Sequence, residues 1–389
     1  MPAEASDPIQ ETPDYGDLAL VMGGGGARAA YQVGLLRHLA RRYPDLSIPI
    51  ITGVSAGAVN AAMLAQHHGT FAQAVEELSA LWLELMPERV FRVDPASLMG
   101  KVVRSSIQLF SGGARPGQRM RGMVSTEPLR TFLNEAMGRV SGELTGIDHN
   151  LQRGSLKAVA IITTSYTTGQ SVVWVQGRDI ETWERSKRRS VNCRLTVEHV
   201  MASTALPLFF PAISVRDEWY GDGGIRLTAP LSPALHLGAH KIFAVSTRYA
   251  STRQEADRHA VEGYPPPAQV LGLLYNAIFL DLIDQDVLRM QRMNGLLHQL
   301  PKEERLGMRV VELFVIQPSQ DLGRLARDYE PRLPASFRFL SRGLGTGDTR
   351  SADLLSMIMF QSDYLRRLID LGEADAEAQA DRIAAFVEL

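Results

Sequence analysis

The first part of the chain alternates between two kinds of hydrophobic pattern. Short apolar runs at residues 18–22 and 48–52 predict buried strands, and each run is followed at once by glycine or other small residues. A stretch with apolar side chains on one helical face follows at 27–41, and a helix of small residues is expected at 56–66. Two successive units of strand, loop and helix predict a parallel sheet covered by helices.

The same patterns place elements along the rest of the chain. Further elements are expected as a helix at 71–85, strands at 157–163, 170–175 and 241–246, and a short helix through the sequence ASTALP. A polar stretch at 251–262 marks a candidate boundary, beyond which the pattern is mostly helical with one strand at 309–316. We therefore expect one α/β domain over 18–250 and a mostly helical C-terminal region over 251–389.

Two segments differ in composition from the remainder. Residues 1–17 are acidic, contain proline and lack the basic start and apolar stretch of a signal peptide, so we expect a disordered tail. Residues 88–122 carry seven Arg and Lys against two Asp and Glu, together with a cluster of Ser, Gly and Pro. We interpret them as a mobile, basic insertion, which is either a solvated surface loop or else a lid or a contact for anionic lipid headgroups.

Composition and charge narrow the class of protein. The chain has 389 residues, of which 45% are apolar and 22% charged, as is typical of a soluble globular protein. A formal net charge of −2 argues against a nucleic-acid partner, and the single cysteine, Cys193, permits no intrachain disulfide and no cysteine-based metal cluster. No apolar run reaches the roughly 18 residues of a spanning helix. We expect a cytoplasmic protein, peripheral to membranes at most, and leave its oligomeric state open.

The sequence GVSAG at residues 53–57 carries the strongest chemical signal. It matches the pattern G-x-S-x-G between a predicted strand and a predicted helix, where a sharp turn projects the Ser55 hydroxyl away from the sheet. Gly53 and Gly57 let the chain turn tightly and let the two elements approach each other. Ser55 would also lie at a helix N-terminus, which favours developing negative charge. This context predicts a nucleophilic serine.

The glycines at 23–26 allow two interpretations. Gly24, Gly26 and Ala29 fit a dinucleotide-binding fingerprint, but that site needs an acidic residue at the end of the second strand, which this sequence lacks. In the other interpretation Gly24, Gly25 and Gly26 expose backbone N–H groups that stabilise the oxyanion of an acyl intermediate. Their position beside GVSAG favours the oxyanion loop.

A third motif surrounds an acidic residue. Asp222 is followed by Gly223 and Gly224 and preceded by another glycine, which suits a carboxylate in a tight turn that a second backbone approaches closely. Asp-Gly is also a common turn dipeptide, so the motif alone indicates no function.

Together these motifs resemble the patatin-like phospholipase family. The residues that carry the resemblance are GGGGARAAYQVG, GVSAG, the ASTALPLFFP segment (Ala202 to Pro211) and GDGG, in the family's order over roughly residues 18–250. The resemblance implies a three-layer α/β/α fold with a mainly parallel sheet, and hydrolysis of phospholipid or related lipid esters without a metal or other cofactor. Two departures are small: plant members carry Asp where this chain has Gly23, and glycine is usual at the position of Ala29.

The resemblance also implies roles for individual residues. Ser55 corresponds to the nucleophile and Asp222 to its base, in a dyad without histidine. Gly24, Gly25 and Gly26 correspond to the oxyanion loop, and Arg28 to the basic position of that loop. An unperturbed aspartate, with a pKa of about 3.9, is a weak base at neutral pH, so we expect partial burial to raise it.

Two alternatives stay open at this point. One is an α/β-hydrolase with a Ser–Asp–His triad, for which His236, His240, His259 and His298 are the histidines after Asp222, although none lies in a distinctive motif. In that fold the serine turn normally follows several strands, whereas here it follows the second. The other alternative is a catalytically idle lipid- or protein-binding module that keeps the fold.

Overall fold

The computed structural model describes residues 17–92, 122–137, 142–257, 264–334, 338 and 352–388. The predicted tail lies outside this part of the chain except for Asp17, and so do residues 93–121 of the predicted basic insertion. Among the helices of the described segments, none combines the length and the hydrophobicity that a membrane span requires.

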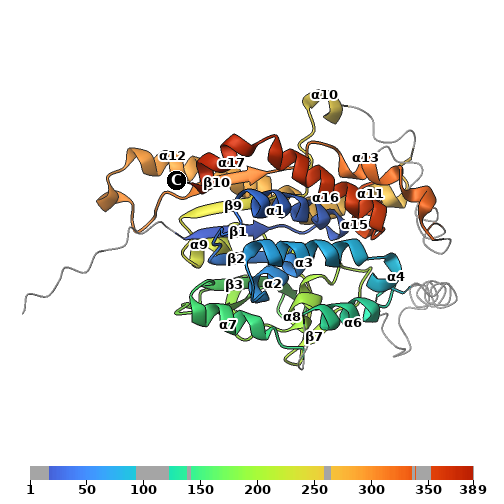
Figure 1. The fold of residues 1–389 in the computed structure, drawn as a ribbon, viewed down its shortest axis with the longest axis horizontal. Coiled ribbons are helices and arrows are strands. Elements are labelled where there is room, and N and C mark those ends of the chain that lie inside the picture. Colours follow the sequence, from blue (N-terminus) through green and yellow to red (C-terminus); the bar gives the residue numbers. More distant parts are fainter. Residues whose placement is uncertain are drawn as a thin grey trace, which may run out of the picture.

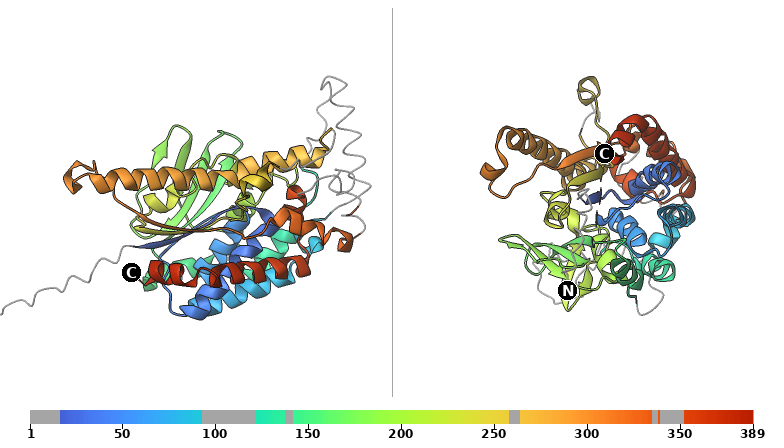
Figure 2. Two further views of the ribbon diagram at one scale, coloured as in Figure 1. Left: turned by 90° about the horizontal axis from the view of Figure 1, so that it is seen from above. Right: turned by 60° about the vertical axis from the view of Figure 1, so that its left-hand side comes forward.

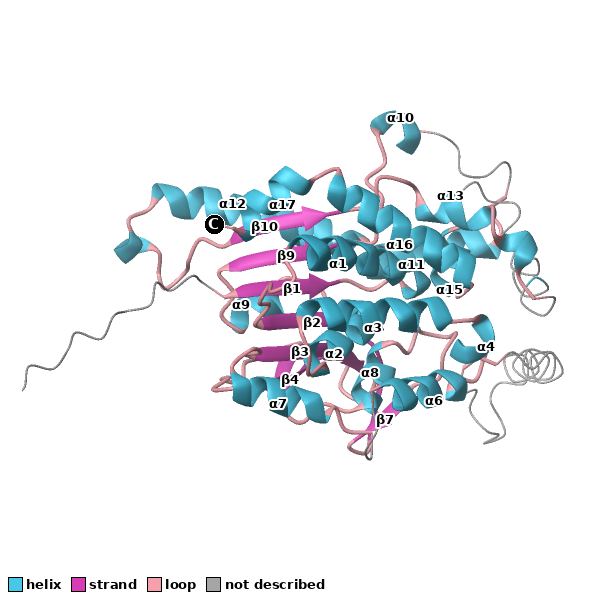
Figure 3. Ribbon diagram, in the orientation of Figure 1, coloured by secondary structure: helices cyan, strands magenta, loops and turns pink. Residues whose placement is uncertain are grey.

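One twisted sheet organises the described chain. Ten strands take the order β10-β9-β1-β2-β3-β4-β6-β5, and β8 pairs with both β3 and β7 (Figure 3). The five strands from β10 to β3 are parallel, whereas β4 is antiparallel to β3. The strands are β1 (Leu18–Met22), β2 (Ile50–Val54), β3 (Ala158–Ser165), β4 (Ser171–Gly177), β5 (Glu184–Arg185), β6 (Arg188–Asn192), β7 (Ile213–Val215), β8 (Glu218–Asp222), β9 (Lys241–Val245) and β10 (Glu312–Ile316).

Helices cover both faces of this sheet. Figure 1 shows α1, α2, α3 and α16 over the near face, and Figure 2 shows the long α11–α12 arm on the opposite face. The helices are α1 (Ala30–Arg42), α2 (Ala56–Gln66), α3 (Phe71–Glu84), α4 (Pro87–Val90), α6 (Glu127–Ala136), α7 (Thr145–Arg153), α8 (Val197–Ser203), α9 (Ser232–His236), α10 (Arg253–Ala256), α11 (Pro267–Phe279), α12 (Asp281–Gln299), α13 (Leu322–Arg327), α15 (Asp353–Ile358), α16 (Ser362–Glu377) and α17 (Ala380–Val387), with short 3₁₀ turns such as η1 (Gly26–Ala29) and η2 (Gly223–Ile225). The predicted three-layer α/β/α class is confirmed.

Strand β1 explains why its sequence is a continuous apolar run. Leu20 and Met22 belong to the core under α1, α2 and α16, whereas Ala19 and Val21 belong to the core on the other face. A strand buried on both faces needs apolar side chains at every position, in contrast to the alternating pattern of a half-exposed strand.

The C-terminal region shares its core with the rest of the chain. Strand β10 extends the sheet beside β9, close to the predicted strand at 309–316. Helix α16 crosses α1 at two glycines: a Cβ on Gly34 would lie 1.9 Å from the Ile369 carbonyl oxygen, and one on Gly372 would lie 2.0 Å from the Tyr31 carbonyl oxygen. The Tyr31 hydroxyl also donates a 3.0 Å hydrogen bond to the Asp375 carboxylate. The two helices are therefore packed backbone against backbone.

Several elements depart from the expected pattern. The basic run at 184–192 forms β5 and β6 at one edge of the sheet, and a β7–β8 hairpin precedes Asp222; neither was expected from the sequence. The helix expected through ASTALP ends at Ser203, so that the segment from Ala205 is non-helical. Edge strands carry exposed charged residues, which weakens the apolar pattern on which strand prediction depends.

Candidate active site

Ser55 lies on a strained turn at the carboxyl edge of the sheet. It follows β2, precedes α2 and adopts φ 55° and ψ −133°, a conformation that non-glycine residues rarely take. A Cβ on Gly53 would lie 2.4 Å from the Gly57 carbonyl oxygen, and a Cβ on Gly57 would lie 2.4 Å from that of Met22. The two glycines thus allow the close approach of strand and helix that the sequence predicts.

A second serine holds this turn in place. The Ser55 backbone N–H donates a 2.9 Å hydrogen bond to the Ser203 hydroxyl, which donates in turn to the Ile162 carbonyl oxygen at 2.6 Å. Ser203 is the last residue of α8 and is fully buried. The ASTALP segment therefore connects the serine turn to strand β3.

Asp222 ends strand β8 and lies beside Ser55. Its side chain is fully buried, and Oδ1 accepts a 2.9 Å hydrogen bond from the Gly224 N–H. Oδ2 has no hydrogen bond of ordinary geometry within the described residues. Burial raises the pKa of Asp222 to about 7, against the smaller lowering effects of the Ser55 hydroxyl and the Gly224 N–H. The carboxyl is consequently a much stronger base than an exposed aspartate.

The glycines after Asp222 are required by close packing. A Cβ on Gly223 would lie 2.3 Å from the Ile162 carbonyl oxygen, and one on Gly224 would lie 2.2 Å from the ring of Phe279. The Thr164 hydroxyl donates a 2.8 Å hydrogen bond to the Asp222 carbonyl oxygen. These contacts fix the carboxyl against β3 on one side and α11 on the other.

The glycine loop lies directly against Ser55. A Cβ on Gly24 would lie 2.9 Å from the Ser55 Cβ, and the Gly24 carbonyl oxygen accepts a 2.7 Å hydrogen bond from the Thr247 hydroxyl. Gly25 has φ 134°, a conformation that favours glycine. Within the described chain the N–H groups of Gly24 and Gly25 donate no hydrogen bond. Both glycines therefore lie in a close-packed loop at the serine, with N–H groups that are unbonded in the described chain.

Arg28 belongs to the same loop but points away from the serine. Its guanidinium is buried and pairs with Asp353 at 2.6 Å and with the Ser356 hydroxyl at 2.6 Å. The structure therefore brings Ser55, Asp222 and the glycine loop together and places the Arg28 side chain against helix α15.

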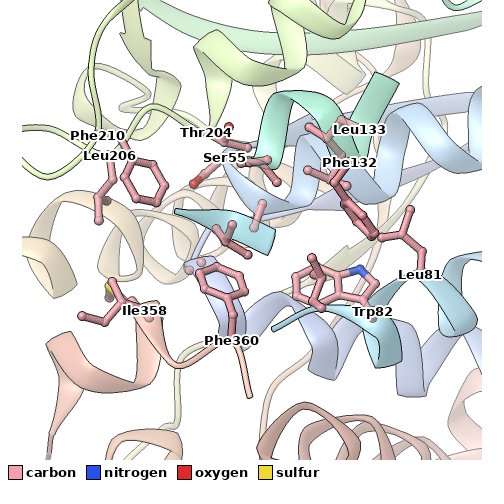
Figure 4. Close-up of a pocket in the computed structure, with 18 of the residues that line it drawn as sticks. Ser55, Leu81, Trp82, Phe132, Leu133, Thr204, Leu206, Phe210, Ile358 and Phe360 are labelled. Atoms are coloured by element: carbon pink, nitrogen blue, oxygen red, sulfur yellow. The ribbon is translucent and has the colours of Figure 1, made fainter. Parts of the chain in front are cut away.

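An apolar pocket opens at Ser55. The Ser55 hydroxyl faces a space walled by α2, α3, α6, the ASTALPLFFP segment and α15, with about 50 Å³ free for solvent (Figure 4). Leu81, Trp82, Phe132 and Leu133 lie to one side of Ser55, and Leu206, Phe210 and Ile358 lie to the other. The remaining lining residues are Gly25, Gly26, Ala56, Val59, Leu85, Val90, Leu129, Thr204, Phe279, Met357 and Phe360. Such a lining suits a hydrocarbon chain.

Histidine does not enter the described site. His236 stacks on Trp183 at the surface, His240 and His298 are exposed, and His259 lies outside the described residues. None of the described histidines hydrogen-bonds to Ser55 or Asp222, so the triad has no candidate in the described chain. In the same part of the chain, no three His, Cys, Asp or Glu side chains gather closely enough to hold a metal ion.

Several residues around the carboxyl carry no sign of their position in the sequence. Tyr166 and Tyr275 lie near enough to Asp222 for its charge to raise their pKa, after the larger effect of burial. Phe279 lines the pocket from α11, and Met357 lines it from α15. These residues come from segments far from GVSAG in sequence, and none of them lies in a motif that indicates a role at the site.

The described chain thus places an apolar pocket at a strained serine, at the carboxyl edge of a mainly parallel sheet. Residues 20–235, more than half of the chain, match the model of the patatin-like phospholipase family. The chain belongs to this family, as its motifs indicated. None of the curated proteins in the comparison matches it.

Solved structures give weaker likenesses. Human GIVD cytosolic phospholipase A2 aligns with 99% of this chain at 12% identity and a TM-score of 0.47, and the alignment covers 64% of the human chain. VipD from Legionella pneumophila aligns with 91% of this chain at 13% identity and a TM-score of 0.32, covering 67% of that chain. This chain therefore spans less than two thirds of the human structure.

Proposed function

We propose that this protein hydrolyses carboxylic ester bonds of phospholipids or related lipids, with Ser55 as nucleophile and Asp222 as its base. The observation that carries the proposal is the position of Ser55 between a buried carboxyl with a pKa of about 7 and an apolar pocket. Membership of the patatin-like phospholipase family supports the same reaction class.

The acylation step follows from these positions. Ser55 Oγ attacks the ester carbonyl carbon while its proton passes to the Asp222 carboxylate. The carbonyl oxygen becomes an oxyanion, for which the N–H groups of Gly24 and Gly25 are the donors beside the serine. When the tetrahedral intermediate collapses, the bond to the leaving alcohol breaks, and the alcohol takes the proton from Asp222. The product is an acyl ester on Ser55.

Deacylation uses the same groups with water as the nucleophile. Asp222 accepts a proton from water as the water oxygen attacks the acyl carbon, and the oxyanion forms again beside the glycine loop. Collapse breaks the bond to Ser55 Oγ, which takes the proton back, and the fatty acid leaves. The acyl chain would occupy the apolar pocket throughout, because Ser55 lies within its wall.

The test is labelling and turnover of the full chain. A fluorophosphonate probe should label the wild-type protein and leave Ser55→Ala unlabelled, and a panel of phospholipids and short-chain esters should show hydrolysis by the wild type alone. Equal labelling of the two proteins, or absence of hydrolysis by a folded wild type across the panel, would contradict the proposal.

Helix α11 supports a peripheral contact with a lipid surface. Its sequence from Pro267 to Leu280 contains no charged residue, and its outward side chains Val270, Leu273 and Leu274 are 46%, 58% and 53% exposed. Its inward residue Phe279 lines the pocket. We propose that the stripe formed by Val270, Leu273 and Leu274 lies on the lipid surface from which the substrate enters. Exposed apolar patches of this kind mark sites of contact with membranes or other proteins.

Vesicle binding tests this contact separately from the chemistry. The double variant Leu273→Glu, Leu274→Glu should bind phosphatidylcholine vesicles at least about tenfold more weakly, because two leucines lose apolar burial. It should still hydrolyse a soluble ester at the wild-type rate. Leu296→Glu, at an equally exposed position of α12, is the control. Unchanged vesicle binding by the double variant would refute the contact. The expected lipid contact of the basic insertion 88–122 stays a prediction.

A further inference from the structure

The side chain of Arg28 joins the glycine loop to the C-terminal region. Arg28 lies in η1, directly after the loop, and is 3% exposed. Its Nε donates to the Ser356 hydroxyl at 2.6 Å, and one terminal nitrogen donates to Asp353 Oδ1 at 2.6 Å and to the Asp353 carbonyl oxygen at 3.4 Å. A buried guanidinium needs such partners, because an unpaired charge inside a protein is strongly unfavourable.

The backbone of the loop touches the same helix. Gly26 has φ 58°, and a Cβ at that position would lie 2.1 Å from the Met357 carbonyl oxygen. The end of the glycine loop is therefore packed against the last turn of α15. Met357 and Ile358 continue from this contact into the wall of the pocket, as does Phe360 just beyond α15 (Figure 4).

Helix α15 also contacts α11 and α13. Gly272 of α11 packs against it, with a Cβ position 3.4 Å from the Asp353 Cβ, and the Ala352 N–H donates to the Gly323 carbonyl oxygen of α13 at 3.3 Å. The chain then continues into α16, which crosses α1 at Gly34 and Gly372. Helix α1 begins where η1 ends. Arg28 in η1 and its partners in α15 therefore lie between two elements, α1 and α16, that are packed against each other.

We propose that Asp353 and Ser356 are positioning residues for catalysis, which hold the N–H groups of the glycine loop through Arg28. The carbonyl oxygens of the loop are fixed, since Thr247 donates to Gly24 at 2.7 Å and the Arg28 N–H donates to Gly25 at 3.2 Å, whereas the Gly24 and Gly25 N–H groups donate no hydrogen bond within the described chain. Oxyanion donors are effective when they are held in place before the charge develops. The C-terminal region thereby becomes part of the catalytic unit, an inference that rests on the proposed hydrolysis at Ser55.

The test compares full-length variants for rate, affinity and folding. Asp353→Asn should lower kcat for a soluble short-chain ester by about tenfold to a hundredfold, and Ser356→Ala should lower it by at least about threefold. For comparison, complete loss of an oxyanion donor costs up to about a thousandfold. KM should change less than about threefold, because neither side chain lines the pocket. Asp353→Glu, which keeps the charge, should recover part of the rate lost in Asp353→Asn.

Controls separate this inference from the proposed function and from unfolding. Asp363→Asn removes the exposed ion pair with Arg332 in the same region and should leave kcat and melting temperature unchanged. A wild type without fluorophosphonate labelling refutes the proposed function itself. An active wild type with a folded Asp353→Asn of equal kcat refutes the positioning role. If Asp353→Asn does not fold, Ser356→Ala decides: a folded variant with wild-type kcat overturns the inference.

Discussion

The hydroxyl of Ser203 accepts a hydrogen bond from the backbone N–H of Ser55 at 2.9 Å and is the only side chain of the described residues that does so. It donates its own proton to the Ile162 carbonyl oxygen at 2.6 Å. The strained turn is therefore fixed to strand β3 by a residue 148 positions away in sequence. This contact explains why the ASTALP segment accompanies the serine motif.

Replacing Ser203 should impair the turn more than the pocket. In Ser203→Ala the Ser55 N–H becomes a buried donor without a partner, which costs about 1–3 kcal/mol. We expect a lower melting temperature and a loss in kcat of about tenfold, with KM nearly unchanged. Ser203→Thr keeps the hydroxyl and should retain most of the activity. An Ala variant with wild-type kcat would show that the contact has no catalytic importance.

The raised pKa of Asp222 predicts the pH dependence of hydrolysis. Only the carboxylate form can accept the Ser55 proton, and burial raises the pKa to about 7. The value of kcat/KM should therefore be half-maximal near that pKa and level off above it. Below the pKa it should fall about tenfold for each pH unit. An aspartate with an ordinary pKa of about 3.9 would give a flat profile over the same range. The measurement is kcat/KM for a soluble ester from about pH 5 to about pH 9.

The dyad and the triad make different predictions for histidine. Asp222→Asn should lower kcat at least about a hundredfold, the lower end for positioned general-base catalysis. Alanine variants of His236, His240, His259 and His298 should each stay within about tenfold of the wild type. A histidine variant that remains folded yet loses as much activity as Ser55→Ala would favour the triad.

The same carboxyl predicts a pH-dependent effect on stability. Its pKa is about 7 in the folded protein and about 3.9 in the unfolded chain, so the folded protein binds more protons between these values. The free energy of unfolding therefore falls as pH rises through this window. Asp222→Asn removes the buried charge and should raise the melting temperature at about pH 8, with a smaller gain at about pH 5. A gain independent of pH would contradict this, and Asp363→Asn serves as the exposed control.

Much of the sheet and the serine turn could be predicted because their signals are local. Strands β1 and β2 are apolar runs that end in small residues, and the G-x-S-x-G pattern is contained within five positions. The β7–β8 hairpin could not be predicted because its turn lacks the usual Asn-Gly or Asp-Gly signature. Arg216 and Asp217 adopt the positive φ values of 50° and 66° there.

Contacts over long sequence distances could not be predicted in this way. The motif places Arg28 in the glycine loop, but its partner Asp353 lies 325 positions away, in a segment without a recognisable motif. The burial of Asp222 depends on β3 and α11, which meet it only in the folded chain. The expected rise in the pKa of Asp222 is confirmed in direction. The size of the rise depends on complete burial of the carboxyl, which the sequence does not reveal.

The pocket beside Ser55 predicts which acyl chains the protein accepts. Val59 lies one helical turn after Ser55 in α2 and lines the pocket, so its side chain faces the start of a bound acyl chain. Val59→Phe should fill this space. We expect kcat/KM for long-chain esters to fall at least about tenfold and that for acetyl esters to change less than about threefold. The reason is that one poorly fitting group in an apolar pocket costs about 1–3 kcal/mol. Leu296→Phe, at an exposed position of α12 outside both the pocket and the α11 surface, is the control for an added aromatic ring. Equal losses for long and short chains, in a variant with a normal melting temperature, would place the acyl chain elsewhere.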